Sequence, residues 1–176
     1  MCPGLHRRTA GAYSGDMVQR IISGGQTGVD RAALDAAIAC GIPHGGWCPR
    51  GRLAEDGRIP DRYNLQETPG AAYAERTLKN VVEADATLIL HRGPISGGTW
   101  LTVQFAHKHK KPLCVVSLAE PPAAGQVLAW LHEHQVQTLN VAGPRESTEP
   151  GIYQDAYLFL HRLFQTILAS SRSSSA

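Results

Sequence analysis

Short apolar runs alternate with longer amphipathic segments from residue 18 to residue 168. The short runs are rich in β-branched residues, as buried strands are, and the longer segments repeat apolar residues with helical spacing. Such alternation predicts a parallel sheet with helices on both faces. We therefore expect an α/β fold of the Rossmann-like, doubly wound type with a mainly parallel sheet. Strands are expected at residues 18–23, 46–48, 87–91, 113–117 and 138–141, and helices at residues 28–40, 71–84, 99–108, 123–134 and 153–168.

The most informative stretch is IISGGQTGVDRAAL, residues 21–34, in which an apolar run meets paired glycines and then a helix. Glycines let a ligand approach the backbone, and the first amides of a helix carry partial positive charge. Thr27 and Asp30 have the spacing of a capping box, which predicts a helix start near Gly28. A turn that only lets strand and helix pack closely is the structural alternative. The residues assigned to anion binding here are Gly24, Gly25, Gln26, Thr27, Gly28 and Asp30.

This loop departs from the common nucleotide-binding motifs. It lacks the Gly-Lys-Ser/Thr ending of ATPase phosphate loops, so no lysine is placed to reach a terminal phosphate. Its glycines read GGxxG rather than the GxGxxG of dinucleotide enzymes. No acidic residue closes the next expected strand, where one would bind a ribose. Ordinary NAD binding is therefore disfavoured.

A second glycine-rich loop, GPISGGT at residues 93–99, follows another expected strand and again opens a helix. Ligands of open parallel sheets gather at the carboxyl ends of the strands. Two loops of this kind at neighbouring strand ends predict one site for an anionic small molecule, covered from both sides. On the second side we assign Ser96, Gly97, Gly98 and Thr99.

The segment PRGRLAEDGRIPDR, residues 49–62, is a long polar loop after a strand, and such loops are often functional. Guanidinium groups bind phosphate, and carboxylates accept hydrogen bonds from ribose, pterin or base donors. We assign Arg50, Arg52 and Glu55 to the site, although a solvated loop with internal ion pairs fits the pattern equally well. The neighbouring carboxylates of Glu55 and Asp56 have no third ligand, so no metal site is assigned.

A third strand-end segment is NVAGPRES, residues 140–147. Arg145 is positioned to reach over the strand ends and is assigned to the site; the alternative is a surface ion pair with Glu146 or Glu149. Tyr153, which follows shortly, either stacks on a planar ring of the ligand or belongs to the core.

Composition restricts the partners and the compartment. The formal net charge is +2, and the one basic run, HKHKK at residues 107–111, falls at an expected helix end, so we expect no nucleic-acid partner. Four cysteines without a C-x-x-C pair favour reduced thiols and a cytoplasmic location. No apolar stretch is long enough to cross a bilayer, so no membrane partner is expected.

The ends and the last helix predict the domain organisation. We expect a flexible extension at residues 1–16, a single Rossmann-like domain at residues 17–169 and a disordered serine-rich tail at residues 170–176. The helix expected at residues 153–168 is apolar over more than one stripe. It is therefore either buried within one subunit or shared in a homo-oligomer, a dimer or tetramer.

Six segments occur in a recognisable order: GGQTGVDRAALDAA, GGWCPRGRLAEDGRIP, YNLQET, RTLKNV, GGTWLT and NVAGPRES. With them, residues 18–168 resemble the molybdenum cofactor carrier family. That family belongs to the SLOG group of Rossmann-like proteins, together with the Lonely-Guy phosphoribohydrolases. The resemblance implies a Rossmann-like fold, a molybdenum cofactor (molybdopterin) or nucleotide-like ligand, and self-association. It also implies binding and protection of that cofactor, with molybdoenzymes as recipients.

One departure argues against an enzyme. The Lonely-Guy motif P-G-G-x-G-T-x-x-E ends in a glutamate that serves N-glycosidic cleavage, and SGGTWLTVQF offers Thr102 or Phe105 at that place. The sequence also gives no support for a catalytic Ser-His-Asp or Cys-His arrangement. We therefore expect a cytoplasmic binding and carrier protein for a phosphate-bearing small molecule. The alternatives are a nucleotide N-glycosidase or phosphoribohydrolase, in which Asp30, Glu55 or Asp56 would act instead, and a nucleotide-ligand sensor.

Overall fold

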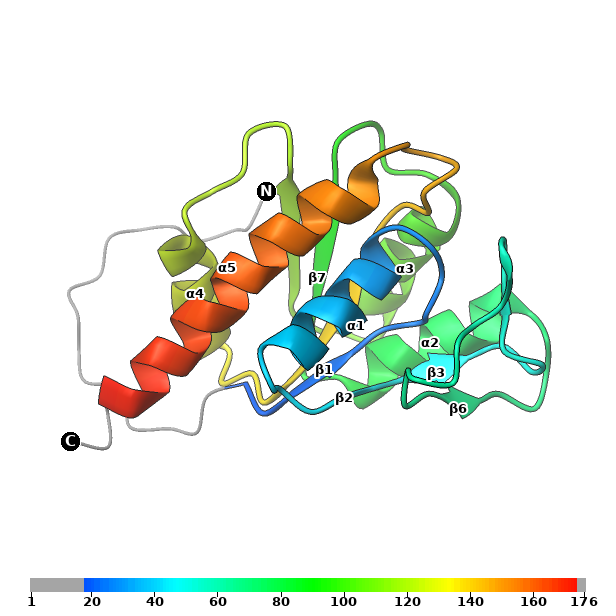
Figure 1. Cartoon of the computed structure of the whole chain (residues 1–176), viewed down its shortest axis with the longest axis horizontal. Coiled ribbons are helices and arrows are strands. Elements are labelled where there is room, and N and C mark those ends of the chain that lie inside the picture. The colour runs from blue at the N-terminus through cyan, green and yellow to red at the C-terminus, as the bar shows by residue number, and fades with distance from the viewer. Residues whose placement is uncertain (1–17, 174–176) are drawn as a thin grey trace.

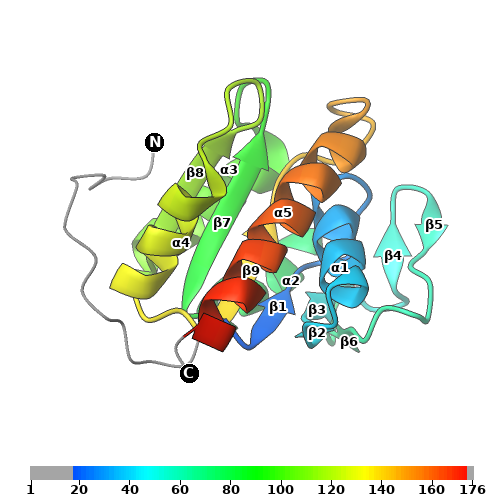
Figure 2. The same cartoon turned by 60° about the vertical axis from the view of Figure 1, so that its left-hand side comes forward.

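A five-stranded, wholly parallel sheet forms the centre of the computed structural model, which describes residues 18–173 (Figures 1 and 2). The strand order is β2-β1-β9-β7-β8, so the last strand of the chain lies in the middle. The mainly parallel α/β arrangement predicted from the sequence is thereby confirmed. The strands are β1 (Arg20–Ile22), β2 (His44–Gly45), β7 (Ala86–His91), β8 (Leu113–Ser117) and β9 (Thr138–Ala142).

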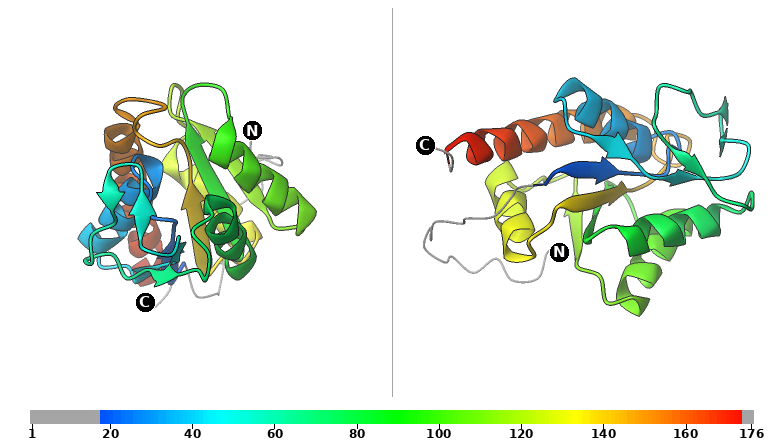
Figure 3. Two further views of the ribbon diagram at one scale, coloured as in Figure 1. Left: turned by 90° about the vertical axis from the view of Figure 1, so that its right-hand side faces the viewer. Right: turned by 90° about the horizontal axis from the view of Figure 1, so that it is seen from below.

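Helices cover both faces of this sheet (Figure 3). On one face, α5 (Ile152–Ser173) packs against α1 (Val29–Ala39) and α4 (Ala124–Glu133). On the other face, α2 (Tyr73–Glu83) packs against α3 (Gly97–Lys108). The crossovers from β1 to β2 and from β7 to β8 run in opposite directions along the sheet. The topological switch point therefore lies around β9, between β1 and β7.

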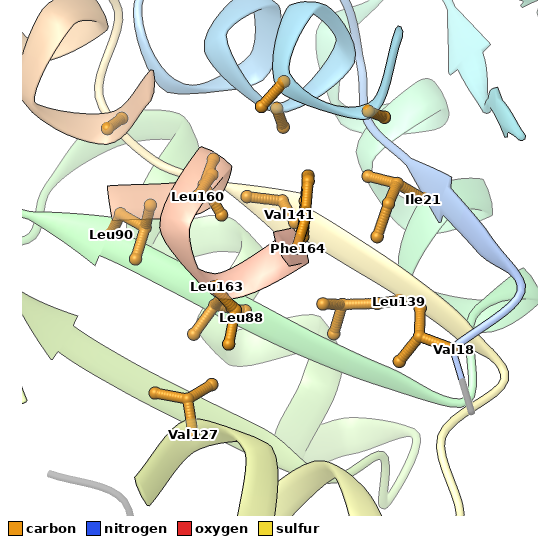
Figure 4. Close-up of a cluster of buried hydrophobic side chains, with 14 of the residues drawn as sticks. Val18, Ile21, Leu88, Leu90, Val127, Leu139, Val141, Leu160, Leu163 and Phe164 are labelled. Atoms are coloured by element: carbon orange, nitrogen blue, oxygen red, sulfur yellow. The ribbon is translucent and has the colours of Figure 1, made fainter. Parts of the chain in front are cut away.

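The main core lies between the sheet and α5 (Figure 4). Leu160, Leu163 and Phe164 are fully buried and project from α5 toward the apolar side chains of β7 and β9, among them Leu88 and Val141. Spacings of three and four residues place these α5 side chains on one helical face. Burial of large apolar groups on both sides of the contact fixes how α5 lies across the strands.

The chain leaves the sheet after β2 because Gly46 turns it away. Gly46 has a φ of +123°, and a Cβ there would lie 2.3 Å from the carbonyl oxygen of Ser23. The expected strand at residues 46–48 is therefore β3 (Trp47–Cys48), which pairs with β6 (Gln66–Glu67) outside the main sheet. The expected polar loop contains a short antiparallel hairpin, β4 (Leu53–Ala54) and β5 (Gly57–Arg58).

Several expectations concern the ends, the cysteines and the membrane. Helix α5 continues through residues 170–173, which were expected in the tail; residues 1–16 and 174–176 lie outside the described residues. Cys40 and Cys48 are free thiols, as the sequence analysis expected, and Cys2 lies outside the described residues. Within residues 18–173, no helix is both long and apolar enough to span a bilayer.

Candidate functional site

A cavity of about 440 Å³ opens beside the carboxyl ends of β1, β9 and β7, at the switch point of the sheet. Its walls come from the loop after β1, the loop after β9 and the first turns of α2 and α3. Ligands of open parallel sheets bind at this place. The cavity brings together about half of the residues expected from the sequence: Gln26, Asp30, Ser96, Gly97, Gly98, Thr99 and Arg145.

The start of α3 presents open backbone donors to the cavity. Within the described residues, the amides of Gly97, Gly98 and Thr99 have no hydrogen-bond partner, and the first helical bond runs from the Trp100 amide to the Ser96 carbonyl at 3.2 Å. The Ser96 side chain does not cap the helix. A Cβ on Gly97 or Gly98 would meet nothing within 4 Å, and both glycines line the cavity. The second glycine loop therefore has the form of an anion-binding helix start.

The loop after β1 differs, because three of its amides are engaged inside the protein. The Gln26 amide donates to Asp30 Oδ2 (3.3 Å), the Thr27 amide to Gln26 Oε1 (3.0 Å) and the Val29 amide to the Pro144 carbonyl (3.2 Å). The expected capping box is wrong: Gly28 is the N-cap and no side chain caps α1. The amides of Gly25 and Gly28 have no partner among the described residues, but neither glycine lines the cavity.

The three glycines of this loop support the cavity without lining it. A Cβ at Gly24 would lie 1.7 Å from Arg76 Nη1, and one at Gly25 would lie 2.6 Å from the Leu65 side chain. Gly28 has a φ of +78°, and its Cβ would lie 2.4 Å from the Pro144 carbonyl oxygen. These positions therefore hold the backbone close to its neighbours.

The two assigned arginines of the polar loop also lie outside the cavity lining. Arg50 is exposed, and its amide donates to the Gly70 carbonyl. Arg52 is buried, and its guanidinium holds the following segment by donating to four backbone carbonyls, those of Ile59, Pro60, Tyr63 and Leu65. In this structure Arg52 organises the loop and does not face the cavity.

An ion pair that the sequence analysis missed forms the floor of the cavity. Arg76 Nη1 of α2 lies 3.1 Å from Asp30 Oδ2 of α1, and their side chains are only 13% and 4% exposed. Burial raises the pKa of the Asp30 carboxyl, while the Arg76 charge and the Gln26 amide act in the opposite direction. Arg76 opens the RTLKNV segment, which was noted only for the family resemblance, and its partner is 46 residues away in sequence.

The aromatic residue of the cavity lining is Tyr73, not Tyr153. The guanidinium carbons of Arg76 and Arg145 lie 5.7 and 5.5 Å from the centre of the Tyr73 ring. Tyr153 instead donates its hydroxyl to Asp35 Oδ2 at 2.6 Å and stacks on Tyr157. Tyr73 thus connects the two arginines of the cavity.

Glu55, at the tip of the β4–β5 hairpin, binds the hairpin to the loops after β1 and β9. Its carboxylate accepts hydrogen bonds from the Thr27 hydroxyl and from the hydroxyl and amide of Ser147, and Arg145 Nη1 lies 3.8 Å away. The next residue, Asp56, pairs with Arg31, with Asp56 Oδ1 at 2.7 Å from Nη2. Glu55 and Asp56 therefore have internal partners, and neither lines the cavity.

Replacing Glu55 with glutamine should loosen this hairpin. Burial raises the pKa of the Glu55 carboxyl, but hydrogen bonds from Ser147 and Thr27 outweigh it and lower the pKa below the usual 4.5. The contact of the β4–β5 hairpin with the loops after β1 and β9 should therefore persist above pH 4.5 and weaken as the pH falls through the lowered pKa of Glu55. In E55Q the loss of a charged acceptor, about 1 kcal/mol, should speed tryptic cleavage after Arg58 about fivefold.

Mass spectrometry of tryptic fragments at neutral pH measures this effect. E120Q is the matched control, since exposed Glu120 lies in the loop after β8 and has no partner among the described residues. Equal cleavage rates in E55Q and E120Q would show that the Glu55 contacts do not hold the hairpin.

These features define a Rossmann-like α/β domain with a ligand-sized cavity at its switch point and free amides on one wall. Among residues 18–173, no cluster of three His, Cys, Asp or Glu side chains is placed to hold a metal ion. The model of the circularly permutated YpsA SLOG family matches residues 21–164, and the chain belongs to this family.

A solved structure agrees with this assignment. The "Putative molybdenum carrier protein" from Syntrophus aciditrophicus SB is 47% identical to this chain and superimposes with a TM-score of 0.83. The match covers 87% of this chain and 99% of that one. No curated protein matches the chain. The resemblance to SLOG proteins and molybdenum carriers noted in the sequence is thus confirmed.

Proposed function

We propose that this protein binds and carries a phosphate-bearing small molecule, the molybdenum cofactor, in the cavity at the carboxyl edge of the sheet. The observation that carries the proposal is the row of amides at Gly97, Gly98 and Thr99, which belong to the cavity lining and have no partner among the described residues. Amides at a helix start bind phosphate oxygens without a cationic side chain. The positive end of the α3 dipole adds to this attraction.

The size and charge of the cavity support the same proposal. Its volume of about 440 Å³ lies within the range of small-molecule sites. Arg145 lines the cavity and its side chain is 37% exposed. Its one ion-pair partner among the described residues, Glu55, lies 3.8 Å away, so the guanidinium is available to a second acceptor. The name of the Syntrophus aciditrophicus relative favours the molybdenum cofactor among phosphate-bearing ligands.

A carrier role is favoured over hydrolysis by the surroundings of the carboxylates. Asp30 is the only carboxylate among the described lining residues, and its Oδ2 is engaged by the Gln26 amide and Arg76. Thr102, at one of the two places where a Lonely-Guy glutamate would align, donates its hydroxyl to the Gly98 carbonyl at 2.9 Å. A general acid or base needs a free path to the reacting atom, which the Asp30 pair restricts. Release of free base from a nucleoside monophosphate would instead support the glycosidase.

The α3 site is tested by changing Gly98 to aspartate, with asparagine as the matched control. G98D places a negative charge at the second residue of α3, where it favours the helix but repels an anionic ligand. We expect calorimetry with molybdopterin, guanosine 5′-monophosphate and inorganic phosphate to show binding to the wild type. Affinity should fall at least tenfold in G98D, change little in G98N, and the thermal stability of G98D should not fall.

Two results would contradict the proposal: no binding of any of the three probes to the wild type, or equal binding to wild type and G98D. Cytoplasmic location, delivery to molybdoenzymes and self-association through α5 stay predictions. For the last, Leu158 of α5 is 57% exposed and available to a second copy.

A further inference from the structure

Two buried donors belong to residues of the cavity lining and have no acceptor among the described residues. They are Gln26 Nε2 and Arg76 Nε, and both are shielded from solvent. Gln26 as a whole is only 5% exposed. Leaving a buried donor unsatisfied costs about 1–3 kcal/mol, so folded proteins rarely do so without a functional reason. These two atoms therefore point to a group that the ligand supplies.

The orientation of the Gln26 amide is fixed by the protein. Its oxygen, Oε1, accepts hydrogen bonds from the amides of Thr27 (3.0 Å) and Glu55 (2.9 Å). Rotating the side-chain amide by half a turn would place its NH₂ group against two N–H donors. The nitrogen is therefore the atom left for a ligand, and it can only donate.

The floor is polar but carries no net charge, because Asp30 neutralises Arg76. The Gln26 backbone amide and Arg76 Nη1 contact the same oxygen, Asp30 Oδ2, at 3.3 and 3.1 Å, so both residues belong to one corner of the cavity. A second anionic group placed there would meet the Asp30 carboxylate. A neutral acceptor, such as a carbonyl oxygen or an unprotonated ring nitrogen, would satisfy both donors without that repulsion.

We infer that Gln26 and Arg76 form a specificity subsite for the heterocycle of the ligand, while its phosphate is bound at α3. This inference rests on the function proposed above. The heterocycle recognised is one that presents a ring carbonyl beside an unprotonated ring nitrogen, as guanine does with O6 and N7 and an oxidised pterin does with O4 and N5. Adenine, which presents an amino donor beside its ring nitrogen, matches only one of the two donors. Asp30 is the positioning residue that holds Arg76.

Calorimetry with guanosine 5′-monophosphate, adenosine 5′-monophosphate and ribose 5-phosphate tests this subsite, because the three probes share one phosphate. The wild type should bind the guanosine probe at least tenfold more tightly than the other two. Q26E keeps the two accepted hydrogen bonds but loses the NH₂ donor, and R76K keeps a cation for Asp30 but loses the guanidinium. In each variant we expect the preference for guanosine 5′-monophosphate over ribose 5-phosphate to shrink about tenfold.

The ratio of the affinities for guanosine 5′-monophosphate and ribose 5-phosphate isolates the contribution of the heterocycle, because any change in the net charge of the protein acts equally on both phosphates. Equal wild-type affinity for all three probes, or an unchanged ratio in both variants, would overturn the subsite while leaving the phosphate site at α3 in place. Failure of all three probes to bind the wild type would contradict the proposed function and the subsite together.

Discussion

Replacing Arg76 with methionine is expected to lower the free energy of unfolding by about 3–5 kcal/mol, because the buried carboxylate of Asp30 then loses its cation. Asp30 is 4% exposed at its side chain, so water cannot take the place of the guanidinium. The apolar methionine fills much of the same volume, which keeps the loss of packing small. The predicted cost is therefore mainly electrostatic.

Urea denaturation of R76M, D30N and the double variant separates this cost from other effects. If the cost arises from the unpaired charge, D30N should restore more than half of the stability that R76M loses. Additive losses in the double variant would show instead that Arg76 stabilises the fold through packing alone.

The pH dependence of R76M follows from the same pair. Burial raises the pKa of the Asp30 carboxyl above its usual 3.8, so the stability linked to its protonation is present below pH 3.8 and lost as the pH rises through the raised value. Without Arg76 this pKa should rise further. The deficit of R76M relative to wild type should then be smaller at about pH 5 than at about pH 8; an equal deficit at both would contradict this account.

Replacing Gly28 with alanine should cost about 3 kcal/mol of stability, although the change adds one methyl group. Gly28 has a φ of +78°, a conformation that disfavours any side chain. Its Cβ would also lie 2.4 Å from the Pro144 carbonyl oxygen and 2.8 Å from the Glu146 amide nitrogen. Both are backbone atoms of the loop after β9, which must shift to make room.

Gly41 supplies the matched control, since it has a similar φ of +69° but nothing within 4 Å of an added Cβ. G41A should therefore cost only the conformational penalty, about 1 kcal/mol. Thermal unfolding of both variants measures the difference, which reports the close approach of the loop after β9 to α1. Similar losses in the two variants would mean that this approach adds nothing to the cost.

Local signals were sufficient to place most of the fold. The expected strand at residues 113–117 coincides with β8, and the helices begin or end within a few residues of the expected positions, because apolar periodicity is a local property. The strand at residues 46–48 was misplaced because His44 and Gly45 complete the sheet before Gly46 turns the chain. A φ of +123° is open to glycine but is not specified by it, so this turn was invisible in the sequence.

The site was only partly predictable for a similar reason. Glycine-rich helix starts are visible in the sequence, and the loop before α3 was recognised on that basis. In the loop after β1, the Val29 amide bonds Pro144 from a distant part of the chain, and the Gln26 amide bonds the side chain of Asp30, which folds back on the loop. Neither contact is visible in the sequence. Tyr73 was missed because it is an ordinary residue on an amphipathic helix. Arg76 opens the RTLKNV segment, but nothing local in the sequence indicates its buried partner Asp30. From the sequence, Arg52 was expected to bind phosphate. In the structure its guanidinium instead donates hydrogen bonds to four backbone carbonyls of the segment that follows it.

The central place of β9 has a consequence for how the protein is made. Its neighbours β1 and β7 are both synthesised earlier, and neither pairs with the other in the finished sheet. Until β9 emerges from the ribosome, the nascent chain can therefore form two half-sheets, each with an unpaired edge facing the gap. Completion of the domain waits for its last strand, and chaperone protection of those edges is most needed just before that moment.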